Sequence, residues 1–487
     1  MVNSLINQAA IALDTKNAII EFKHVSFKYP DDEASVFKDI SFSILEGERI
    51  VLSGPSGCGK STLLYLMNRL YPSNCDGELS GSLRLWNKDA ASYAPGEINA
   101  RIATVFQDPD AQFCMPIVEQ EMAFTLENLH VPWLEMERRI TETLAMTGLT
   151  TFRKTTIHTL SGGMKQRVAT ACAILMQPEV LLLDEPLAHL DPLSAKEYVE
   201  WLDNLRLSHS LTVVAVEHRL DLWGSFFDRA IHVHPSGNLP VEMNPVRSSM
   251  IFPKRISSIQ SEFAFEATNV SVQVKGKQLL KDVSLRLHQG EIAVLAGPNG
   301  SGKSTFLKTV CGILKKSDGH IESGNSYPGY VPQSPEHLFV TQRVEDEIRF
   351  SNRSDVESIK DIMQRLRLDE IQNAHPFSVS HGQKRRVAIG AMLADQRPVL
   401  LLDEPTSGQD AAALEELFGL IDARAKEGFA VLIVTHDMTF AAAIADTIFL
   451  LNDGELTGRF ENDMLWQHEE VLKYHNLVSP IGECLRA

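Results

Sequence analysis

The sequence predicts an α/β protein with two similar domains in tandem, each built on a mostly parallel β-sheet that helices cover. Three observations lead to this prediction: the length of the chain, an internal repeat, and short apolar runs that alternate with helical segments. With 487 residues, the chain is too long for one compact core. Residues 47–55 (GERIVLSGP) recur as residues 290–298 (GEIAVLAGP), and residues 181–186 (LLLDEP) recur as residues 400–405. Because the order of the motifs is kept, two copies of one domain are the simplest explanation.

Each copy begins with a segment of alternating, strand-forming residues, at 19–29 and at 263–274. A glycine-rich loop and a helix follow, and then a helical stretch at roughly 117–147 in the first copy and 343–373 in the second. Short apolar runs come next, and Asp-Glu or His ends each of them. Such runs are typical of strands buried on both faces, so we expect them to form a parallel sheet.

The expected domain boundaries follow from this repeat. The first domain spans residues 18–240, the second spans residues 263–480, and residues 241–262 form a linker. The linker lacks hydrophobic periodicity and contains Pro245, Pro253 and several serines. It is short and carries few charges.

Composition narrows the class of function. The formal net charge is −17 and the isoelectric point about 5.4, which argues against a protein that coats nucleic acid, because such binding needs a basic surface. The six cysteines show no paired spacing of the zinc or redox kind, as expected in a reducing cytosol. Residues 1–16 lack a signal-peptide pattern, and the longest apolar runs are only as long as strands. We therefore expect any membrane association to depend on partner proteins.

Two phosphate-binding loops carry the strongest functional signal. Residues 54–61 (GPSGCGKS) and 297–304 (GPNGSGKS) both match G-x-x-x-x-G-K-[ST], between a strand-like run and a helical one. Glycines let the backbone amides wrap around phosphates, and the following helix presents its positive end to them. One chance match in a chain of this length has odds of roughly 2%, so two matches at equivalent repeat positions predict two ATP sites.

The last two residues of each loop have separate expected roles. Lys60 and Lys303 would reach the β- and γ-phosphates of ATP. The hydroxyl groups of Ser61 and Ser304 would ligate Mg²⁺.

Acidic pairs follow a buried strand in each copy, at Asp184-Glu185 and Asp403-Glu404. Carboxylates at such positions are costly unless they bind a metal or accept hydrogen bonds. The two aspartates suit Mg²⁺ ligation, directly or through water. The two glutamates suit activation of the attacking water. An isolated Asp-Glu pair would more often cap a helix, but both pairs follow a phosphate loop.

Histidines and glutamines complete each predicted site. His218 and His436 follow the next buried strand in each copy, where an open α/β sheet places its ligand contacts. A lone histidine is more often structural, and the matched positions favour a sensor of the γ-phosphate. Gln107 and Gln333 each precede an irregular stretch and are candidates to contact the metal and the attacking water.

The order of these motifs resembles the ATP-binding cassette (ABC) family over nearly all of both halves. Residues 160–164 (LSGGM) look like the family's signature motif and depart from it only at Met164. Residues 379–383 (VSHGQ) depart at Val379 and at His381. The resemblance implies two P-loop NTPase domains of the ABC ATPase type. Each would have a mostly parallel sheet, an antiparallel β subdomain and a helical subdomain.

In this family two cassettes pair head to tail, and each ATP lies between one phosphate loop and the opposite signature motif. The resemblance implies that nucleotide contacts come from Tyr29, Gly54, Pro55, Ser56, Gly57, Cys58, Gly59, Lys60, Ser61, Thr62, Ser380, His381 and Gly382, and from Gly297, Pro298, Asn299, Gly300, Ser301, Gly302, Lys303, Ser304, Thr305, Ser161, Gly162 and Gly163. The implied catalytic residues are Glu185, Glu404, His218, His436, Gln107 and Gln333. The implied Mg²⁺ contacts are Ser61, Gln107, Asp184, Ser304, Gln333 and Asp403.

The two predicted sites differ in detail. Tyr29 matches the family's adenine-stacking aromatic residue, whereas the second copy has Val274 at this position. The second site should lose stacking worth roughly 1 kcal/mol. The first site would face the altered signature, where His381 adds bulk beside the phosphates. Because each site keeps its glutamate and histidine, we expect both to hydrolyse ATP.

Three kinds of cassette protein fit a chain of this layout. The first is the ATPase of a membrane transporter, at the cytoplasmic face of the cell membrane and bound to membrane-embedded subunits. Residues 118–124 (VEQEMAF) and 344–350 (VEDEIRF) look like the ATPases of energy-coupling-factor importers of vitamins and metals, whose other subunits are a membrane scaffold and a small substrate-binding protein. Fused members are often associated with thiamine or its pyrimidine precursor. An amphipathic helix start is the structural alternative for this motif.

The other two kinds are the ATPase of a sugar importer and a soluble translation factor that acts on ribosomes. Sugar-importer ATPases are less similar after Gln107 and Gln333. A translation factor would have a long, basic, helical linker, which residues 241–262 do not resemble.

Overall fold

The computed structural model describes residues 18–30, 35–55, 57–94, 96–188, 190–207, 211–234, 241–242, 252–253, 255–323, 327–350 and 356–480. Contacts divide the chain into two compact units. The first unit contains Met1–Ala188 and Glu197–Arg247, and the second contains His189–Lys196 and Ser248–Ala487.

A six-stranded sheet forms the centre of the first unit, in the order β10-β9-β3-β8-β7-β6. Its strands are β3 (Arg49–Ser53), β6 (Ile102–Val105), β7 (Val180–Asp184), β8 (Thr212–Val216), β9 (Arg229–His232) and β10 (Val241–Glu242). Neighbouring strands are parallel except β10, which is antiparallel to β9. Every residue of β7 and β8 is buried, as expected for strands with both faces covered.

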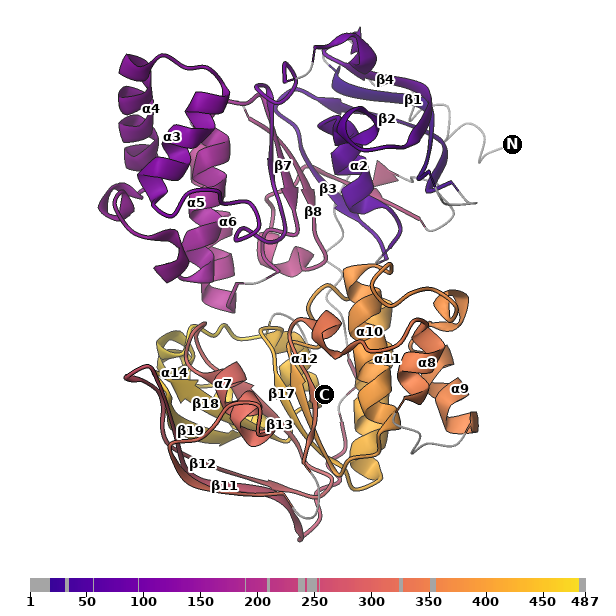
Figure 1. The fold of residues 1–487 in the computed structure, drawn as a ribbon, viewed down its shortest axis with the longest axis vertical. Helices are drawn as coiled ribbons and strands as arrows, with labels where there is room; N and C mark the ends of the chain where they lie inside the picture. Colours follow the sequence, from indigo (N-terminus) through magenta and orange to yellow (C-terminus); the bar gives the residue numbers. More distant parts are fainter. Residues whose placement is uncertain are drawn as a thin grey trace. The chain divides into compact units, whose positions relative to one another are not determined.

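An antiparallel sheet and a set of helices complete the first unit (Figure 1). The antiparallel sheet has the order β2-β1-β4-β5, with β1 (Ala18–Lys28), β2 (Phe37–Leu45), β4 (Glu78–Leu85) and β5 (Lys88–Asp89). The helices are α2 (Lys60–Met67), α3 (Val118–Asn128), α4 (Trp133–Met146), α5 (Gly162–Leu175) and α6 (Pro192–Leu207), of which residues 192–196 are grouped with the second unit. Short helical turns are η2 (Leu70–Asn74), η3 (Ala90–Ser92), η4 (Thr150–Phe152), η5 (Ile157–Thr159) and η6 (Leu220–Trp223).

The second unit repeats this architecture. Its six-stranded sheet has the order β15-β16-β17-β13-β18-β19, with β13 (Ile292–Ala296), β15 (Gly329–Val331), β16 (Val399–Asp403), β17 (Ala430–Val434), β18 (Thr447–Asn452) and β19 (Glu455–Glu461). Only β19 pairs antiparallel. Its antiparallel sheet has the order β12-β11-β14, with β11 (Phe263–Val274), β12 (Lys277–His288) and β14 (Asp318–Glu322). The helices are α7 (Lys303–Val310), α8 (Val344–Arg349), α9 (Val356–Arg365), α10 (His381–Ala394), α11 (Ala411–Lys426), α12 (Met438–Ile444), α13 (Asn462–Leu465) and α14 (Glu469–Tyr474), with turns η7 (Pro335–Leu338) and η8 (Asp369–Ile371).

The fold class predicted from the sequence is therefore confirmed. Each unit has a mostly parallel sheet, an antiparallel sheet and a helical region, as the resemblance implied. The helical stretch expected at 117–147 consists of two helices, α3 and α4. They are separated at residues 129–132, where His130 has a positive φ and Pro132 precedes the second helix.

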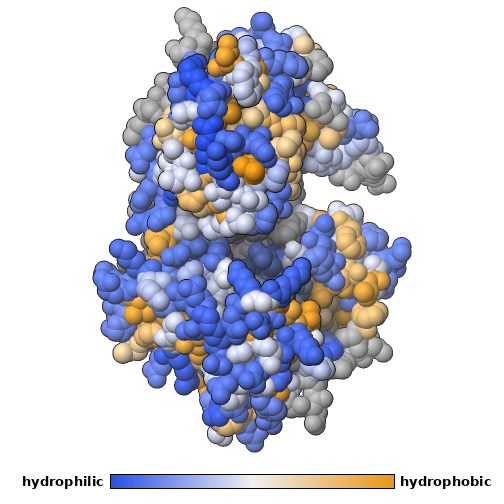
Figure 2. All heavy atoms as spheres, turned by 60° about the vertical axis from the view of Figure 1, so that its left-hand side comes forward, coloured by the Kyte–Doolittle hydropathy of each residue, from blue (hydrophilic) through white to orange (hydrophobic). Residues whose placement is uncertain are grey.

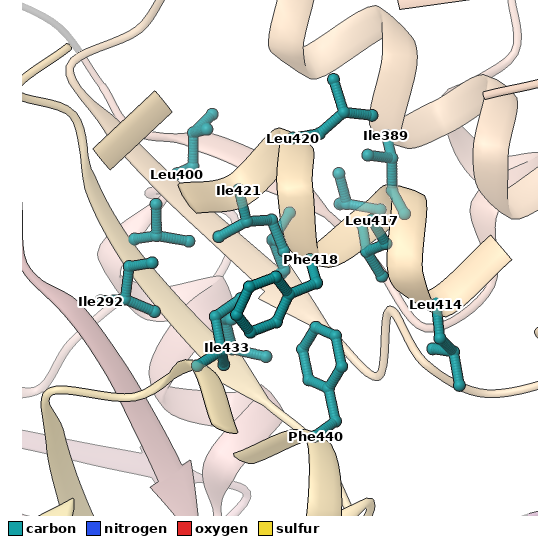
Figure 3. Close-up of a cluster of buried hydrophobic side chains, with 14 of the residues drawn as sticks. Ile292, Ile389, Leu400, Leu414, Leu417, Phe418, Leu420, Ile421, Ile433 and Phe440 are labelled. Carbon is teal, nitrogen blue, oxygen red and sulfur yellow. The ribbon is translucent and has the colours of Figure 1, made fainter. Parts of the chain in front are cut away.

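Apolar side chains between the parallel sheet and helix α11 form a core of the second unit (Figure 3). Ile292, Leu400 and Ile433 come from three strands of the sheet, and Phe418 and Ile421 pack on them from α11. All five side chains are nearly or fully buried. Burial of each such side chain stabilises the fold by roughly 2 kcal/mol. This packing holds the strand ends, on which the site residues lie, in fixed positions.

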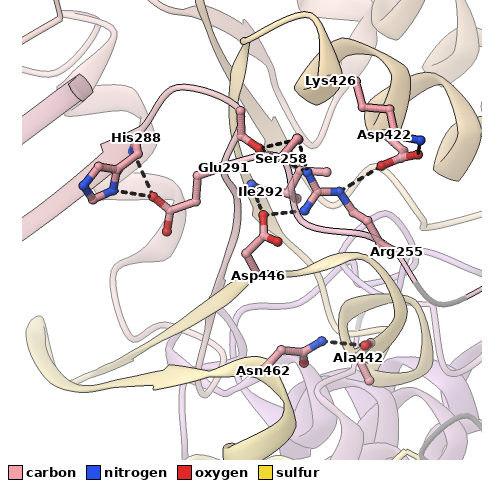
Figure 4. A network of polar contacts seen from close by, with 11 residues as sticks. Arg255, Ser258, His288, Glu291, Ile292, Asp422, Lys426, Ala442, Asp446 and Asn462 are labelled. Atoms are coloured by element: carbon pink, nitrogen blue, oxygen red, sulfur yellow. Dashed lines mark hydrogen bonds and ion pairs between the residues drawn. The ribbon is translucent and has the colours of Figure 1, made fainter. Parts of the chain in front are cut away.

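A buried arginine anchors residues of the predicted linker to the second unit (Figure 4). Arg255 forms ion pairs with Asp422 and Asp446, and its side chain is 3% exposed. Ser258 donates a hydrogen bond to the carbonyl of Gly290. Just before this segment, the ring of Phe252 stacks on Phe418. Part of residues 241–262 therefore packs into the second unit, although their sequence pattern is that of a linker.

The face of the molecule seen in Figure 2 is largely hydrophilic, with separate, small apolar patches. None of the helices in the described ranges is both long enough and apolar enough to cross a bilayer.

Candidate nucleotide sites

The first phosphate loop connects β3 to α2. Gly54 and Gly59 both have positive φ angles, and a Cβ atom at Gly59 would lie 2.5 Å from the ring of Phe37. Only glycine fits there without strain. The ammonium group of Lys60 donates hydrogen bonds to the carbonyls of Gly54 and Pro55, at 3.0 and 2.8 Å. The lysine thus folds over the loop at the place where the motif predicts phosphates.

A hydroxyl–carboxylate pair lies beside this loop. Ser61 Oγ donates a hydrogen bond of 2.9 Å to Asp184 Oδ1, and Tyr65 donates one of 3.1 Å to Oδ2. Burial raises the pKa of Asp184 to about 6, and the neighbouring charge of Glu185 adds to the shift. A buried carboxylate with a raised pKa favours a bound cation, and serine and carboxylate oxygens are ligands that Mg²⁺ prefers. The residues therefore fit a magnesium ion that completes its coordination with nucleotide phosphates and water.

Three predicted catalytic residues of the first unit meet at one carboxylate. Gln107 Nε2 donates a hydrogen bond of 2.9 Å to Glu185 Oε2, and His218 Nε2 lies 3.3 Å from Glu185 Oε1. Glu185 has a φ of 43°, in the left-handed region that non-glycine residues rarely adopt. This turn directs the carboxylate away from the strand β7 and toward His218. The arrangement can orient a water molecule and accept its proton.

The second phosphate loop repeats the geometry of the first between β13 and α7. Lys303 Nζ donates hydrogen bonds to the carbonyls of Gly297 and Pro298, at 2.8 and 2.7 Å. Ser304 Oγ donates a hydrogen bond of 3.1 Å to Asp403 Oδ1. Burial lowers the pKa of Lys303, while nearby carboxylates act in the opposite direction. This unit therefore also holds a lysine over the loop and a pair of oxygen ligands that fit Mg²⁺.

In the second unit, Glu404 lies at the position equivalent to that of Glu185, and its neighbours differ. His436 Nε2 lies 3.3 Å from Glu404 Oε1 and 2.9 Å from the Asn299 side-chain oxygen. Burial raises the pKa of Glu404 to about 7, and the charge of Asp403 adds to the shift. Among the described residues, the side chain of Gln333 makes no hydrogen bond to Glu404. Gln333 is exposed, so only the first unit places its glutamine on the glutamate.

The signature segments begin helices in both units. Ser161 caps α5 by accepting a hydrogen bond from the amide of Met164. Ser380 and Gln383 form a reciprocal capping box at the start of α10. Both helices therefore begin with the serine that the sequence predicted as a phosphate contact. The pairing of each signature with the opposite phosphate loop stays a prediction.

Two predicted contacts lie outside the described parts of the structure. They are Ser56 and the side chain of His381. The predicted adenine-stacking residue, Tyr29, donates or accepts a hydrogen bond of 2.7 Å with Thr62 and packs on Tyr71.

Sequence reasoning missed four polar side chains beside these sites. They are the partly buried Tyr65 and the buried Glu217, Tyr330 and Arg385. Tyr330 donates a hydrogen bond of 3.2 Å to Asp403 Oδ2, as Tyr65 does to Asp184. Glu217 could have been predicted, because it directly follows a buried strand. An acidic residue at the end of a buried strand is the same pattern that identified Asp184.

Comparison with known proteins shows the family of this chain. The family profile described as "ABC transporter" matches residues 37–188 and 280–407. A Bacillus subtilis protein named "Putative HMP/thiamine import ATP-binding protein YkoD" is 36% identical, and the match covers 89% of this chain and 90% of that protein. A Bacillus anthracis protein named "Putative ABC transporter ATP-binding protein" is 31% identical, and the match covers 94% of each chain.

The chain therefore belongs to the ATP-binding cassette family and is a tandem ABC ATPase, an enzyme that hydrolyses ATP. Among solved structures, one titled "RNase-L Inhibitor" aligns with a TM-score of 0.63 and 20% identity over 92% of each chain. At this identity the likeness shows the shared tandem fold.

Proposed function

We propose that this chain is the ATP-hydrolysing subunit of an energy-coupling-factor importer, with thiamine or its pyrimidine precursor HMP as the class of cargo. The observation that carries the proposal is the 36% identity, over 89% of the chain, to a protein named for HMP/thiamine import. The chain would act at the cytoplasmic face of the membrane, bound to a membrane-embedded scaffold and a small substrate-binding subunit.

The V-E-x-E-x-x-F motif, which resembles that of energy-coupling-factor ATPases, has the same structural role in both units. The second glutamate of V-E-x-E-x-x-F is buried in both units, at Glu121 and Glu347. Glu121 accepts hydrogen bonds from the amides of Cys114 and Met115, and Glu347 accepts them from residues 340 and 341. Each glutamate thus folds back on the loop that precedes its helix. A glutamate that only interacted favourably with the dipole at a helix start would not need to be buried. Because these carboxylates are buried and hydrogen-bonded, the motif has a specific structural role.

These loops give each unit a fixed surface between its predicted glutamine and its helical region. In the proposed transporter, these segments would receive the membrane subunits, and a loop held by buried hydrogen bonds supports the proposed docking of a partner. Val340 and Phe350 are 65% and 68% exposed beside Glu347. Exposed apolar side chains at a rigid surface are typical of protein–protein contacts.

In the proposed cycle, each ATP would lie between one phosphate loop and the signature of the other half. Mg²⁺, when bound, would neutralise phosphate charge. Ser61 and Asp184 would hold it in the first site, and Ser304 and Asp403 in the second. Lys60 and its counterpart Lys303 would bind the β- and γ-phosphates.

The glutamates would carry out the proton step of hydrolysis. Glu185 and Glu404 would orient the attacking water and accept its proton. His218 and His436, which touch these glutamates, would report whether a γ-phosphate is present. Hydrolysis would then reverse the closure that ATP binding favours, and the two states would drive the transporter.

Co-purification with membrane partners tests the proposal. The tagged chain is expressed in its own organism, purified from mild detergent, and its partners are identified by mass spectrometry. We expect a polytopic scaffold and a small membrane protein that binds HMP or thiamine. Recovery of ribosomes, or of the subunits of a sugar importer, would contradict the proposal. Uptake of labelled HMP and thiamine by vesicles containing the recovered complex then distinguishes the two cargoes.

A further inference from the structure

The backbone amide of the predicted sensor histidine has different partners in the two units. In the first unit, the amide of His218 donates a hydrogen bond of 2.8 Å to the side chain of Glu217, the residue just before it. In the second unit, the amide of His436 donates one of 3.2 Å to Oε2 of Glu404, the predicted catalytic glutamate. The residue before His436 is Thr435, so a difference in sequence accompanies the difference in bonding.

Glu217 fixes the turn that carries His218 at the end of β8. Its Oε1 accepts a second hydrogen bond, of 3.1 Å, from the amide of Arg219, and its Oε2 accepts one of 3.2 Å from the indole of Trp223. Glu217 and Trp223 are each 3% exposed, and the indole packs against two buried phenylalanine rings. Burial raises the pKa of Glu217. The contacts need only acceptor oxygens, which a neutral carboxyl group also has.

Thr435 does not reproduce this arrangement, because its side chain is shorter and its hydroxyl group has other partners. The hydroxyl oxygen accepts a hydrogen bond of 3.1 Å from the amide of Asp437 and shares one of 2.7 Å with the hydroxyl of Thr406. The threonine thus binds the second amide after β17, and the first, that of His436, binds Glu404. A buried amide needs such a partner.

The partner of this amide determines what the catalytic glutamate contacts. Glu185 Oε2 accepts a hydrogen bond of 2.9 Å from the side chain of Gln107, and Oε1 lies 3.3 Å from His218 Nε2. Glu404 Oε1 lies at the same distance from His436 Nε2, but its Oε2 accepts the backbone amide. A side-chain amide can rotate away when a water molecule enters, whereas a backbone amide at the end of a buried strand stays in place. In the first unit, Oε2 is therefore more readily available to the attacking water.

We propose that Glu217 is a positioning residue for hydrolysis at the first site: it holds the amide of His218, so that Glu185 contacts Gln107 through one oxygen and the side chain of His218 through the other. Glu217 acts through His218 and Glu185. The inference rests on the catalytic role proposed for Glu185 and is independent of the transported cargo.

Steady-state ATP hydrolysis tests the proposal in the full chain with Glu404→Gln, which confines turnover to the first site. Glu217→Thr introduces the residue of the second unit. It should lower kcat about tenfold and leave KM within about twofold, because the nucleotide contacts stay and the carboxylate is displaced. Glu217→Gln should keep most of the rate, since its side-chain oxygen can still accept both backbone amides. An unchanged kcat in Glu217→Thr, or an equal loss in both variants, would overturn the proposal.

Two further variants control for folding. Glu142→Thr, at an exposed position on α4, makes the same substitution away from the site and should leave kcat unchanged. If circular dichroism shows that Glu217→Thr does not fold, Glu217→Met takes its place, because it keeps the length of the side chain and removes the acceptor oxygens.

A crystal structure of the ligand-free Glu217→Thr chain tests the geometry separately from turnover. We expect the amide of His218 to donate to Glu185 and the contact of Glu185 with Gln107 to be lost. In the Glu404→Gln background, Glu185→Gln should abolish turnover, which tests the catalytic role by itself. If turnover depends on Glu185 but the His218 amide does not bind it in the Glu217→Thr chain, the inference is overturned and the proposed catalytic role stands.

Discussion

Tyr65 donates a hydrogen bond of 3.1 Å to Asp184, on the carboxylate oxygen opposite the one that Ser61 contacts. The second unit makes the same contact from a different element, because Tyr330 lies on β15 whereas Tyr65 lies on α2. Both expected Mg²⁺ carboxylates are therefore held from two sides. A tyrosine at this place orients the carboxylate and leaves the other oxygen on the serine, where it would be available to a bound Mg²⁺.

Loss of either tyrosine hydroxyl should weaken the binding of Mg²⁺. Tyr65→Phe or Tyr330→Phe keeps the ring and removes the hydrogen bond that orients the aspartate. Loss of a side chain that holds a metal ligand in position typically lowers the affinity for the metal about 10–100-fold. We expect a rise of about tenfold in the Mg²⁺ concentration that gives half-maximal ATP turnover. Tyr93→Phe, which loses a hydrogen bond to a backbone carbonyl elsewhere, is the control. No change in Mg²⁺ dependence in the site variants would refute the role.

Glu404 should make the stability of the ligand-free chain depend on pH. Its pKa is raised to about 7 in the folded state, against an ordinary value of about 4.3 in the unfolded state. The folded chain therefore binds the extra proton between these values. The stability that this proton contributes is complete below the unfolded pKa and is lost as pH rises through the folded pKa.

Glu404→Gln removes this dependence. Between pH 5 and pH 8, the variant should gain roughly 2 kcal/mol in the free energy of unfolding relative to the wild-type chain. Urea unfolding without nucleotide or Mg²⁺, followed by circular dichroism at several pH values, measures the change. Glu415→Gln, an exposed position on α11, is the control. A constant difference between variant and wild type across this pH range would show that Glu404 is charged at pH 5.

The two catalytic glutamates should differ in their importance for turnover. Glu404→Gln should reduce the steady-state rate of ATP hydrolysis more than Glu185→Gln does. The reason is that the second site is expected to face the signature of residues 160–164, which departs from the family pattern only at Met164. Colorimetric phosphate release by the purified variants measures both rates. Equal losses would count against this ranking.

Arg255 should stabilise the second unit by linking the segment before β11 to two partly buried carboxylates. Arg255→Met leaves Asp422 and Asp446, whose side chains are 15% and 8% exposed, with fewer partners, and losses of this kind cost up to about 3–5 kcal/mol. Lys281→Met breaks an exposed ion pair with Glu455 and should cost less than about 1 kcal/mol. Chemical unfolding compares the two variants. Similar stabilities would mean that the buried network contributes little.

Local motifs in the sequence predicted the parts of the sites that a short segment encodes. Lys60, Ser61 and Asp184 come together because a strand, a loop and a helix N-terminus have a fixed geometry once the motif is present. The strands that carry them could also be predicted, because their apolar runs are long enough for a strand and too short for a membrane helix.

The remaining site residues depend on contacts between distant segments. Tyr65 and Tyr330 reach equivalent aspartates from non-equivalent elements, so comparison of the repeats could not reveal them. Arg385 lies in a polar helix start, and its burial and its hydrogen bond to the carbonyl of Gln333 depend on the packing of distant segments. The side chain of Gln333 is exposed, whereas Gln107 contacts Glu185.

The stoichiometry of nucleotide binding tests the central claim most directly. Equilibrium dialysis with labelled ATP and Mg²⁺, using the Glu185→Gln/Glu404→Gln chain to prevent turnover, counts the bound nucleotides. We expect two nucleotides per chain, one after either Lys60→Ala or Lys303→Ala is added, and none after both. Absence of ATP binding, or full binding by the chain that lacks both lysines, would contradict the account.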